Sequence, residues 1–225
     1  MKNILNIAHR GYTRDFPDNT LEAFKAALDL GVDGVEFDVQ ETRDVEFIIH
    51  HDDDLAGKPI AAQKLADLRQ ERIQDKYLIP ILQETLDLLN NKLVLIVELK
   101  QVKSLEKFLE ILRSHVMIDK VVLVSFNPEL ISGLARLAPD IMRAVITGEP
   151  TDDSMKIARA THSGAIGVHY SYLTSELILR AHADNLIVFV WGCTDTQSVR
   201  QALQFDIDGI ISDFPDVVKG ELVIK

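Results

Sequence analysis

Eight short runs of apolar, often β-branched residues recur along this 225-residue chain, and the segments between them repeat apolar residues at helical spacing. Several runs are almost continuous in Val, Ile and Leu, which is typical of strands covered on both faces. Strands that alternate with helices in this way form a parallel sheet. The runs occupy residues 4–8, 34–39, 93–99, 121–125, 141–146, 165–168, 186–191 and 209–211.

Eight parallel strands with intervening helices close most simply into an α/β fold of the (β/α)8 TIM-barrel type. The length and the 47% hydrophobic content suit one such barrel, so we predict a single domain over residues 1–225. A doubly wound open sheet is the alternative, but its first turn usually carries a glycine-rich dinucleotide motif. Here the first run is followed by His9-Arg10-Gly11-Tyr12 instead.

One long connection interrupts the alternation. Residues 52–79 follow the second strand and an extra extended piece at 46–50, and they contain Gly57 and Pro59. Glycine and proline interrupt regular structure, so we predict a small insertion over the barrel mouth, partly helical around residues 62–69.

Helix starts are marked by capping residues. Asn19 precedes Leu21 and has Glu22 three residues further on, a pattern that resembles a capping box. We therefore predict Asn19 as the N-cap of the first helix. Pro128 and Ser175 mark the starts of two later helices.

The charge balance limits the kinds of partner. The chain has 35 acidic and 24 basic residues, for a net charge of −11. Nucleic-acid surfaces are basic, so we expect no nucleic-acid partner. An anionic substrate would meet a repulsive overall field and would need a local positive centre, which a bound metal with Arg10 and Lys100 would supply.

Cysteine content and the N-terminal residues bear on the location of the protein. Cys193 is the one cysteine, which fits a reducing compartment. The apolar stretch of residues 1–9 is interrupted by Asn3 and Asn6 and is too short for a secretion signal. No apolar run approaches membrane-spanning length. We expect a cytoplasmic protein with no stable membrane insertion, and a homodimer is compatible with this size.

Polar side chains follow the predicted strands where they end. His9 and Arg10 come after the first strand, and His51 comes after the extra extended piece. Glu36 and Asp38 lie two residues apart on the second strand, so both carboxylates point to the same side. Active sites of eight-stranded α/β barrels lie at the carboxyl ends of the strands. We therefore expect these residues at the mouth.

The carboxylates indicate a metal site. Close carboxylates repel one another unless a cation lies between them. Glu98, near the end of the third strand, offers a third carboxylate, and Lys100 points the same way two residues later. Hard oxygen ligands select Mg²⁺ or Ca²⁺ over softer metals. We therefore predict that Glu36, Asp38 and Glu98 bind one divalent cation.

The two histidines complete a set suited to breaking a phosphate ester. The cleavage needs a group that takes a proton from the nucleophile and a group that gives one to the leaving alcohol. Imidazole does both near neutral pH because its unperturbed pKa is close to 6.5. His9 and His51, from different strand ends, would take these roles, although which is base and which is acid stays open.

Each signal alone has a simpler interpretation. A histidine after a strand is more often a hydrogen-bonded structural residue, and Glu98 and Lys100 alone would suit a surface ion pair. Trp191, at the end of the seventh strand, would also suit plain core packing. The functional interpretation depends on all these residues falling at strand ends in one barrel.

The chain resembles the glycerophosphodiester phosphodiesterase family. The matching motifs run in order across nearly the whole chain: His9-Arg10-Gly11, Pro17-Asp18-Asn19-Thr20, Gly31-Val32-Asp33-Gly34-Val35-Glu36-Phe37-Asp38-Val39, Thr42-Arg43-Asp44, His51-Asp52, Glu98-Leu99-Lys100, Ser125-Phe126, Trp191 and Asp208-Gly209-Ile210-Ile211-Ser212-Asp213-Phe214-Pro215.

The resemblance implies a metal-dependent barrel enzyme that hydrolyses small-molecule glycerophosphodiesters to glycerol 3-phosphate and an alcohol, with Mg²⁺ or Ca²⁺ as cofactor. It implies that Arg10 contacts phosphate with Lys100 nearby, and that Trp191 lies against the glycerol end. The roles it implies for the histidines and carboxylates are those given above. We interpret Asp213 as a cap of the last helix, and His169 as a residue able to reach the mouth. His50 should point away from His51.

Several positions depart from the family pattern. Asp18 stands where Glu is commoner, and Val45 stands where a turn glycine is common. An arginine that often follows the second histidine would fall near Gly57 and is missing. Trp191-Gly192-Cys193-Thr194 replaces the more usual Trp-Thr-Val-Asn. These changes leave the alcohol preference open.

Two other functions stay open at this point. A hydrophobic mouth would favour a hydrolase of lysophospholipids, in the manner of related phospholipase D enzymes. A non-catalytic binding barrel is the second, although no histidine or carboxylate of the predicted site is lost.

Overall fold

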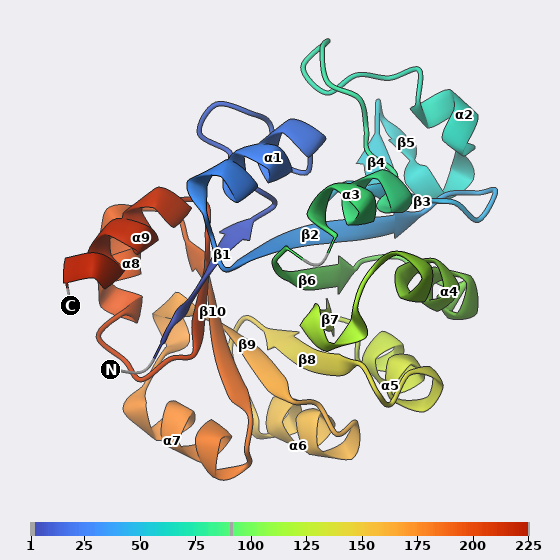
Figure 1. Ribbon diagram of the computed structural model, residues 1–225. Helices are drawn as coiled ribbons and strands as arrows, with labels where there is room; N and C mark the ends of the chain where they lie inside the picture. Colours follow the sequence, from blue (N-terminus) through green and yellow to red (C-terminus); the bar gives the residue numbers. More distant parts are fainter. Residues whose placement is uncertain (1–2, 91, 225) are drawn as a thin grey trace.

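The computed structural model describes residues 3–90 and 92–224, and these form a closed barrel (Figure 1). Its strands follow the order β1-β11-β10-β9-β8-β7-β6-β2, and β1 also pairs with β2, which closes the ring. All eight neighbouring pairs in the ring are parallel. The prediction of an eight-stranded (β/α)8 barrel is confirmed.

The eight barrel strands coincide with the eight predicted apolar runs to within one or two residues. They are β1 (Leu5–His9), β2 (Gly34–Glu41), β6 (Val94–Leu99), β7 (Val121–Ser125), β8 (Met142–Thr147), β9 (Ala165–His169), β10 (Ile187–Cys193) and β11 (Gly209–Ser212). Long stretches of them are buried, because side chains on one face fill the barrel and those on the other pack against helices.

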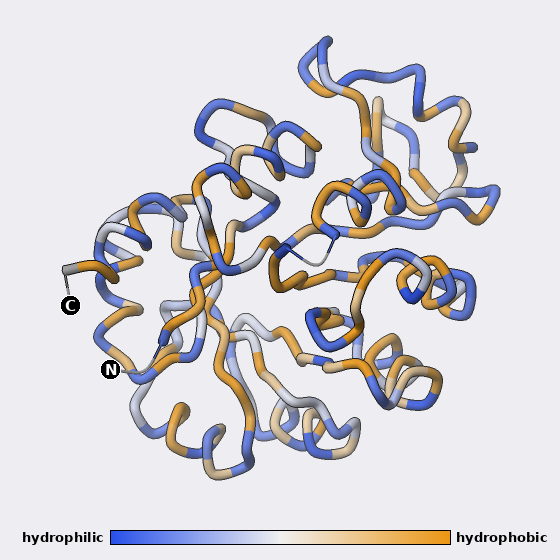
Figure 2. Tube along the Cα trace, viewed as in Figure 1, coloured by the Kyte–Doolittle hydropathy of each residue, from blue (hydrophilic) through white to orange (hydrophobic). Residues whose placement is uncertain are grey.

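Helices surround the barrel. They are α1 (Leu21–Leu30), α3 (Leu82–Leu89), α4 (Leu105–His115), α5 (Pro128–Leu137), α6 (Asp152–Ala160), α7 (Ser175–Ala183), α8 (Thr196–Ala202) and α9 (Pro215–Ile224), with single turns η2 (Ile118–Lys120) and η3 (Tyr170–Tyr172). Figure 2 shows hydrophobic residues along β10, for example, and polar residues in many connections. The main hydrophobic core lies between helices and barrel, and a smaller one fills the barrel interior.

The predicted insertion is a small lobe beside β2. It follows β3 (Phe47–Ile49), which is antiparallel to β2, and comprises the hairpin of β4 (Asp54–Leu55) and β5 (Lys58–Pro59), η1 (Ile60–Ala62) and α2 (Leu65–Leu68). The α-helix is shorter than the predicted helical region at 62–69. Ile48, Ile60, Leu68 and Ile79 form a hydrophobic cluster of their own in this lobe, and the pairing of β3 with β2 joins the lobe to the barrel.

The predicted cap of the first helix is wrong by one residue. Thr20 is the N-cap of α1, and its hydroxyl accepts a hydrogen bond from the amide of Ala23. The amide side chain of Asn19 instead hydrogen bonds to Asp38 at the barrel mouth. Either side chain can cap a helix, and the tertiary contact decides between them. The starts predicted near Pro128 and Ser175 are confirmed by α5 and α7.

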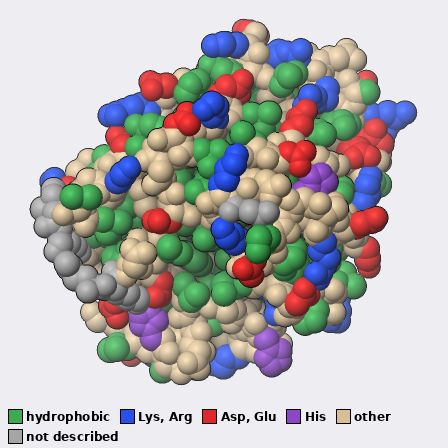
Figure 3. All heavy atoms as spheres, in the orientation of Figure 1, with side chains coloured by type: hydrophobic (Ala, Val, Ile, Leu, Met, Phe, Trp, Pro, Cys, Tyr) green, Lys and Arg blue, Asp and Glu red, His purple; other side chains and the backbone are tan. Residues whose placement is uncertain are grey.

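The described residues include no helix that is both long enough and apolar enough to cross a bilayer. Met1 and Lys2, the first residues of the segment considered as a secretion signal, lie outside the described part of the chain. Acidic and basic side chains are interspersed on the face of the molecule that Figure 3 shows.

Candidate active site

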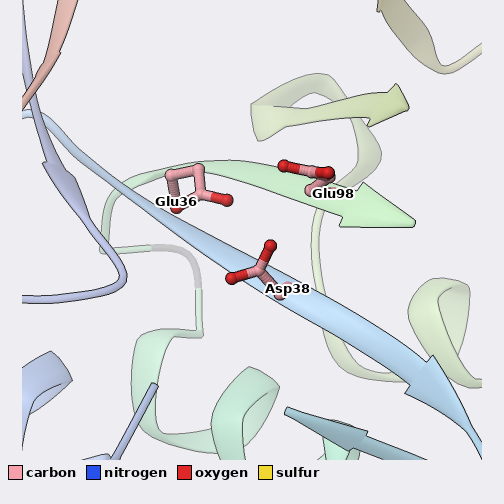
Figure 4. A group of neighbouring side chains, drawn as sticks. All are labelled: Glu36, Asp38 and Glu98. Atoms are coloured by element: carbon pink, nitrogen blue, oxygen red, sulfur yellow. The ribbon is translucent and has the colours of Figure 1, made fainter. Parts of the chain in front are cut away.

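Three carboxylates converge at the mouth of the barrel (Figure 4). Glu36 and Asp38 alternate inward along β2, and Glu98 lies directly opposite Asp38 in the β2–β6 register. One oxygen from each of the three lies within 4.8 Å of the other two. All three residues are buried. The predicted ligand set is therefore brought together by two neighbouring strands.

Burial raises the pKa of Glu36 well above its ordinary value, and the nearby carboxylates of Asp38 and Glu98 raise it further. Burial likewise raises the pKa of Glu98, with Asp38 adding to the rise and Lys100 opposing it. The protein thus concentrates negative charge where water screens it poorly. Such an arrangement calls for a cation.

The protein supplies two cationic side chains to this cluster. Lys100 Nζ lies 2.9 Å from a carboxylate oxygen of Glu98 and 3.9 Å from one of Asp38. Arg10 Nε lies 3.1 Å from the other Asp38 oxygen. The backbone amide of Arg10 also donates to Glu36 over 3.1 Å. Arg10 has a φ of 54°, in the left-handed region, which is sparsely populated outside glycine and Asn.

The site suits a hard divalent cation. Asp38 Oδ1 is buried and accepts no hydrogen bond within the described chain, so this oxygen has a coordination position available. Three carboxylate oxygens from rigid strands match the oxygen ligands that Mg²⁺ and Ca²⁺ take. The cluster can therefore hold such an ion.

His9 is held by an aspartate that the sequence analysis interpreted differently. His9 Nδ1 lies 2.5 Å from Asp213 Oδ1, so the other ring nitrogen, Nε2, stays outside this hydrogen bond. His9 Nε2 lies 3.8 Å from Glu36. Asp213, taken above as a cap of the last helix, thus contacts the imidazole predicted to transfer protons. A carboxylate in this position fixes the tautomer and orientation of a histidine.

His51 is oriented in a similar way, and a buried glutamine holds its loop. The Nδ1 atom of His51 lies 2.7 Å from Asp52, and this hydrogen bond lowers the pKa of Asp52. Gln40 Nε2 donates to the carbonyl oxygens of His51 and Asp52 and to the carboxylate of Asp53. Because Gln40 continues the alternation of Glu36 and Asp38 on β2, it ties the histidine loop to the metal strand.

Gln40 was not among the residues predicted from the sequence, and Asn19 was predicted only as a helix cap. Asn19 donates to Asp38 Oδ2 over 2.8 Å and accepts from the Asp38 amide. Gln40 lies two residues after Asp38 on the same strand, and residues i and i+2 of a strand share a face. This spacing could have identified Gln40 from the sequence. No local signal identifies Asn19, because its partner lies 19 residues away.

A cavity of about 520 Å³ connects the predicted residues. Its lining includes seven of the eight: His9, Arg10, Glu36, His51, Glu98, Lys100 and Trp191. Asp38, the eighth, is fully buried, forms an ion pair with Arg10 and accepts a hydrogen bond from Asn19.

The far wall of the cavity is aromatic. The Trp191 ring packs edge to face against Phe126 and His169, with ring centroids 5.7 Å and 4.7 Å apart. Its indole N–H donates a hydrogen bond to the carbonyl of Thr147. His169 lines the cavity, as the sequence analysis allowed, whereas His50 is absent from its lining. His182 lies in α7 and contacts Asp208.

Comparison with known families agrees with this geometry. Residues 9–217 match the model of the glycerophosphoryl diester phosphodiesterase family. The chain belongs to this family. The match spans β1 to the start of α9 and so includes every predicted site residue.

Members of the family align with the chain over its length. It is 25% identical over 236 residues to a glycerophosphodiester phosphodiesterase of Caldanaerobacter subterraneus subsp. tengcongensis, with 97% of both chains covered. It is 27% identical over 233 residues to one of Bacillus altitudinis, covering 93% of this chain and 94% of the other.

Solved structures share the fold. A phosphodiesterase of Oleispira antarctica, solved in complex with the product sn-glycerol-3-phosphate, superposes with a TM-score of 0.87 at 24% identity over 96% of each chain. A glycerophosphodiester phosphodiesterase of Parabacteroides distasonis has a TM-score of 0.87 at 23% identity over 99% of each chain.

The departures from the family pattern have local structural consequences. Asp18 pairs with Arg10 Nη1 at 3.2 Å. Val45 adopts a φ of 60°, the left-handed region that a glycine would occupy without strain. Gly57, with a φ of 73°, follows Ala56 in the β4–β5 turn and faces open space.

Proposed function

We propose that this chain is a metal-dependent glycerophosphodiester phosphodiesterase that hydrolyses glycerophosphodiesters to glycerol 3-phosphate and an alcohol. The observation that carries the proposal is the cluster of Glu36, Asp38 and Glu98 at one end of a cavity that His9 and His51 also line. Membership of the family supports the same activity.

Glu36, Asp38 and Glu98 would hold Mg²⁺ or Ca²⁺. The ion, when bound, supplies Lewis-acid charge that polarises the phosphoryl oxygens. Asp38 would contribute the buried oxygen that accepts no hydrogen bond within the described chain. Asn19 fixes the Asp38 carboxylate by a hydrogen bond to its other oxygen. A preformed ligand set of this kind loses little conformational entropy when the ion binds.

Arg10 and Lys100 would bind the phosphate. Both cations line the cavity, and each is already placed by a carboxylate of the cluster. They offset the repulsion between an anionic diester and a chain of net charge −11. Their charges would also stabilise the negative charge that develops on phosphoryl oxygens during the reaction.

His9 and His51 would act as the general base and the general acid of the reaction. Each presents Nε2 to the cavity because its Nδ1 contacts an aspartate, Asp213 for His9 and Asp52 for His51. One imidazole takes the proton of the attacking hydroxyl, and the other gives a proton to the leaving alcohol. A positioned acid or base typically contributes 10²- to 10⁴-fold.

The test is an assay of EDTA-treated protein on a panel of glycerophosphodiesters, with Mg²⁺ or Ca²⁺ added back and glycerol 3-phosphate measured. We expect no turnover without metal and recovery when the metal is restored. Lysophosphatidylcholine belongs in the same panel, since preferential cleavage of it would favour the lysophospholipid hydrolase instead. Metal-loaded protein that cleaves no substrate would contradict the proposal.

Replacement of the site residues tests their assigned roles. His51→Ala and His9→Ala should each lower kcat by about 10²-fold or more while metal binding stays near normal. Glu36→Ala should instead weaken the binding of the metal, because it removes a predicted ligand. Calorimetric titration with Mg²⁺ separates the two effects. Near-normal turnover of His51→Ala would disprove the acid–base assignment.

A further inference from the structure

His169 lies across the barrel from the metal strands. It is the last residue of β9, and β9 is four strands from β2 in either direction around the ring (Figure 1). His169 is in register with Trp191 on β10, so the two side chains share a face. Both line the cavity that reaches the carboxylates.

The hydrogen bonds of His169 decide its tautomer. The Nδ1 atom accepts from the backbone amide of Ser171 at 3.4 Å and lies 2.7 Å from the Ser171 hydroxyl. A backbone amide can only donate, so Nδ1 is an acceptor and the neutral ring carries its hydrogen on Nε2. Within the described chain, Nε2 has no hydrogen-bond partner.

A glycine makes room for this ring. A Cβ on Gly192 would come within 2.3 Å of both Cδ2 and Nε2 of His169, a separation that side chains cannot adopt. Gly192 has a φ of 83°, which also favours glycine. The rings of Tyr170 and Trp191 pack against the imidazole from other sides, with centroids 4.8 Å and 4.7 Å from its centroid. Gly192 is one of the departures from the family pattern, so the chain pairs this glycine with a fixed imidazole.

Two cavities meet at the predicted acid–base residue. The first holds His169 and Trp191, and the second, of about 490 Å³ and more open, contains Arg14, Phe16 and Asp18. His9 and Arg10 border both. A phosphate bound by Arg10 would therefore lie at their junction, with one half of the diester on either side. The more enclosed cavity suits the half that all glycerophosphodiesters share, and the open one suits a variable alcohol.

We propose that His169 is a specificity-determining residue whose Nε2–H donates a hydrogen bond to a hydroxyl of the glycerol half of the substrate. The proposal rests on the proposed function. The wall around His169 is mostly apolar, with Phe126, Phe189 and Trp191, although Tyr170 and Thr194 also line it. In a pocket of that kind, a few placed polar groups decide the orientation of the ligand. His169 would thus select a hydroxylated three-carbon group over an apolar one.

The test measures binding of two matched ligands to the Mg²⁺-loaded protein by calorimetry. sn-Glycerol 3-phosphate and propyl phosphate have the same three-carbon length, but only the first has hydroxyls. We expect His169→Phe, which keeps an aromatic ring, to weaken glycerol 3-phosphate binding about tenfold, the usual effect of one lost hydrogen bond. Propyl phosphate binding should change less than twofold. His169→Gln, which keeps a donor, should restore part of the difference.

A second variant tests the position of the ring. Gly192→Ala should displace the imidazole and produce the same selective loss with His169 still present, and circular dichroism verifies its fold. His115→Phe, on α4 and outside the cavity lining, is the matched control and should change neither affinity.

The outcomes separate this inference from the proposed function. Suppose that the wild-type protein cleaves glycerophosphodiesters and that His169→Phe lowers the affinity for both ligands equally or for neither. This result overturns the role of His169 alone. A wild-type protein that cleaves no diester and binds neither ligand overturns the proposed function and this inference with it.

Discussion

Aspartates outside the metal cluster orient the two imidazoles. Asp213 contacts His9 and Asp52 contacts His51, each through Nδ1. The arrangement leaves the second ring nitrogen of each histidine available for the proposed proton transfer. An aspartate that orients a histidine influences proton transfer without touching the substrate. Removing such an aspartate should therefore lower kcat more than it weakens metal binding.

Asp213→Asn tests this at the scale of a residue. The amide keeps the size of the side chain but removes the charge that favours the correct tautomer, so we expect kcat to fall about 10- to 100-fold with an unchanged Mg²⁺ affinity. Asp216→Asn, three residues later in a pair with Arg14, is the control. Equal kcat values for the two variants would argue against the orienting role.

Glu36 gives a pH-dependent prediction for the metal-free protein. Its pKa is raised in the fold by burial and by neighbouring carboxylates, so ionising it costs folding free energy. That cost is absent below its ordinary pKa of 4.5 and grows as the pH rises toward the raised value. Glu36→Gln removes it, so in EDTA the Tm of the variant minus that of the wild type should increase from pH 4 to pH 8.

The control is Glu106→Gln, at an exposed position of α4, for which the Tm difference should stay flat over the same range. A Glu36→Gln difference that is equally flat would mean that the carboxylate cluster is not destabilising without metal.

At the scale of elements, the β2–β3 connection stores strain. Val45 is a β-branched residue at a φ of 60°, where the Cβ approaches the backbone closely. The left-handed conformation costs an L-residue roughly 1–2 kcal/mol. The connection lies next to the β2–β3 pairing that begins with Glu41 opposite Phe47. The strain is therefore close to the strand that carries two of the predicted metal ligands.

Val45→Gly should stabilise the protein by about 1 kcal/mol, because glycine adopts this conformation freely. For a chain of this size, that gain corresponds to a rise in Tm of about 2–4 °C. Val45→Ala keeps a Cβ and should gain less. Thermal unfolding of the three proteins measures the order, and a Val45→Gly variant less stable than the wild type would show that packing of the valine outweighs its strain.

At the scale of the whole molecule, the predicted metal site joins strands from separate βα units. Glu36 and Asp38 come from β2 and Glu98 from β6, while Arg10 after β1 and Lys100 after β6 flank them. The unfolded chain scatters these ligands over more than 60 residues, so it should bind the ion far more weakly than the fold does.

Saturating Mg²⁺ or Ca²⁺ should therefore raise the unfolding temperature. At a concentration 100 times Kd, a ligand of the folded state adds about 2.7 kcal/mol of stability, or a rise in Tm of roughly 5–10 °C for a chain of this size. Differential scanning with and without metal measures the shift. The same rise in a Glu36→Ala variant would place the binding site elsewhere.

The sequence by itself determined the barrel and most of its mouth. Short continuous apolar runs that alternate with helical spacing predicted the eight strands, because strands buried on both faces have this pattern. The spacing of two between Glu36 and Asp38 determined that they share a face, and strand ends placed His9, His51 and Lys100 near them. These properties depend on residues that are close together in the sequence, so they can be recognised without the three-dimensional structure.

Tertiary structure decided the partners. Asn19 leaves the helix start to Thr20 and binds Asp38, and Asp213 turns to His9 across 204 residues of chain. A polar side chain has several possible partners of similar free energy, and burial selects the one that leaves fewest groups unsatisfied. The fit of His169 over Gly192 is of the same kind, because neighbouring strands bring together residues that the sequence keeps apart.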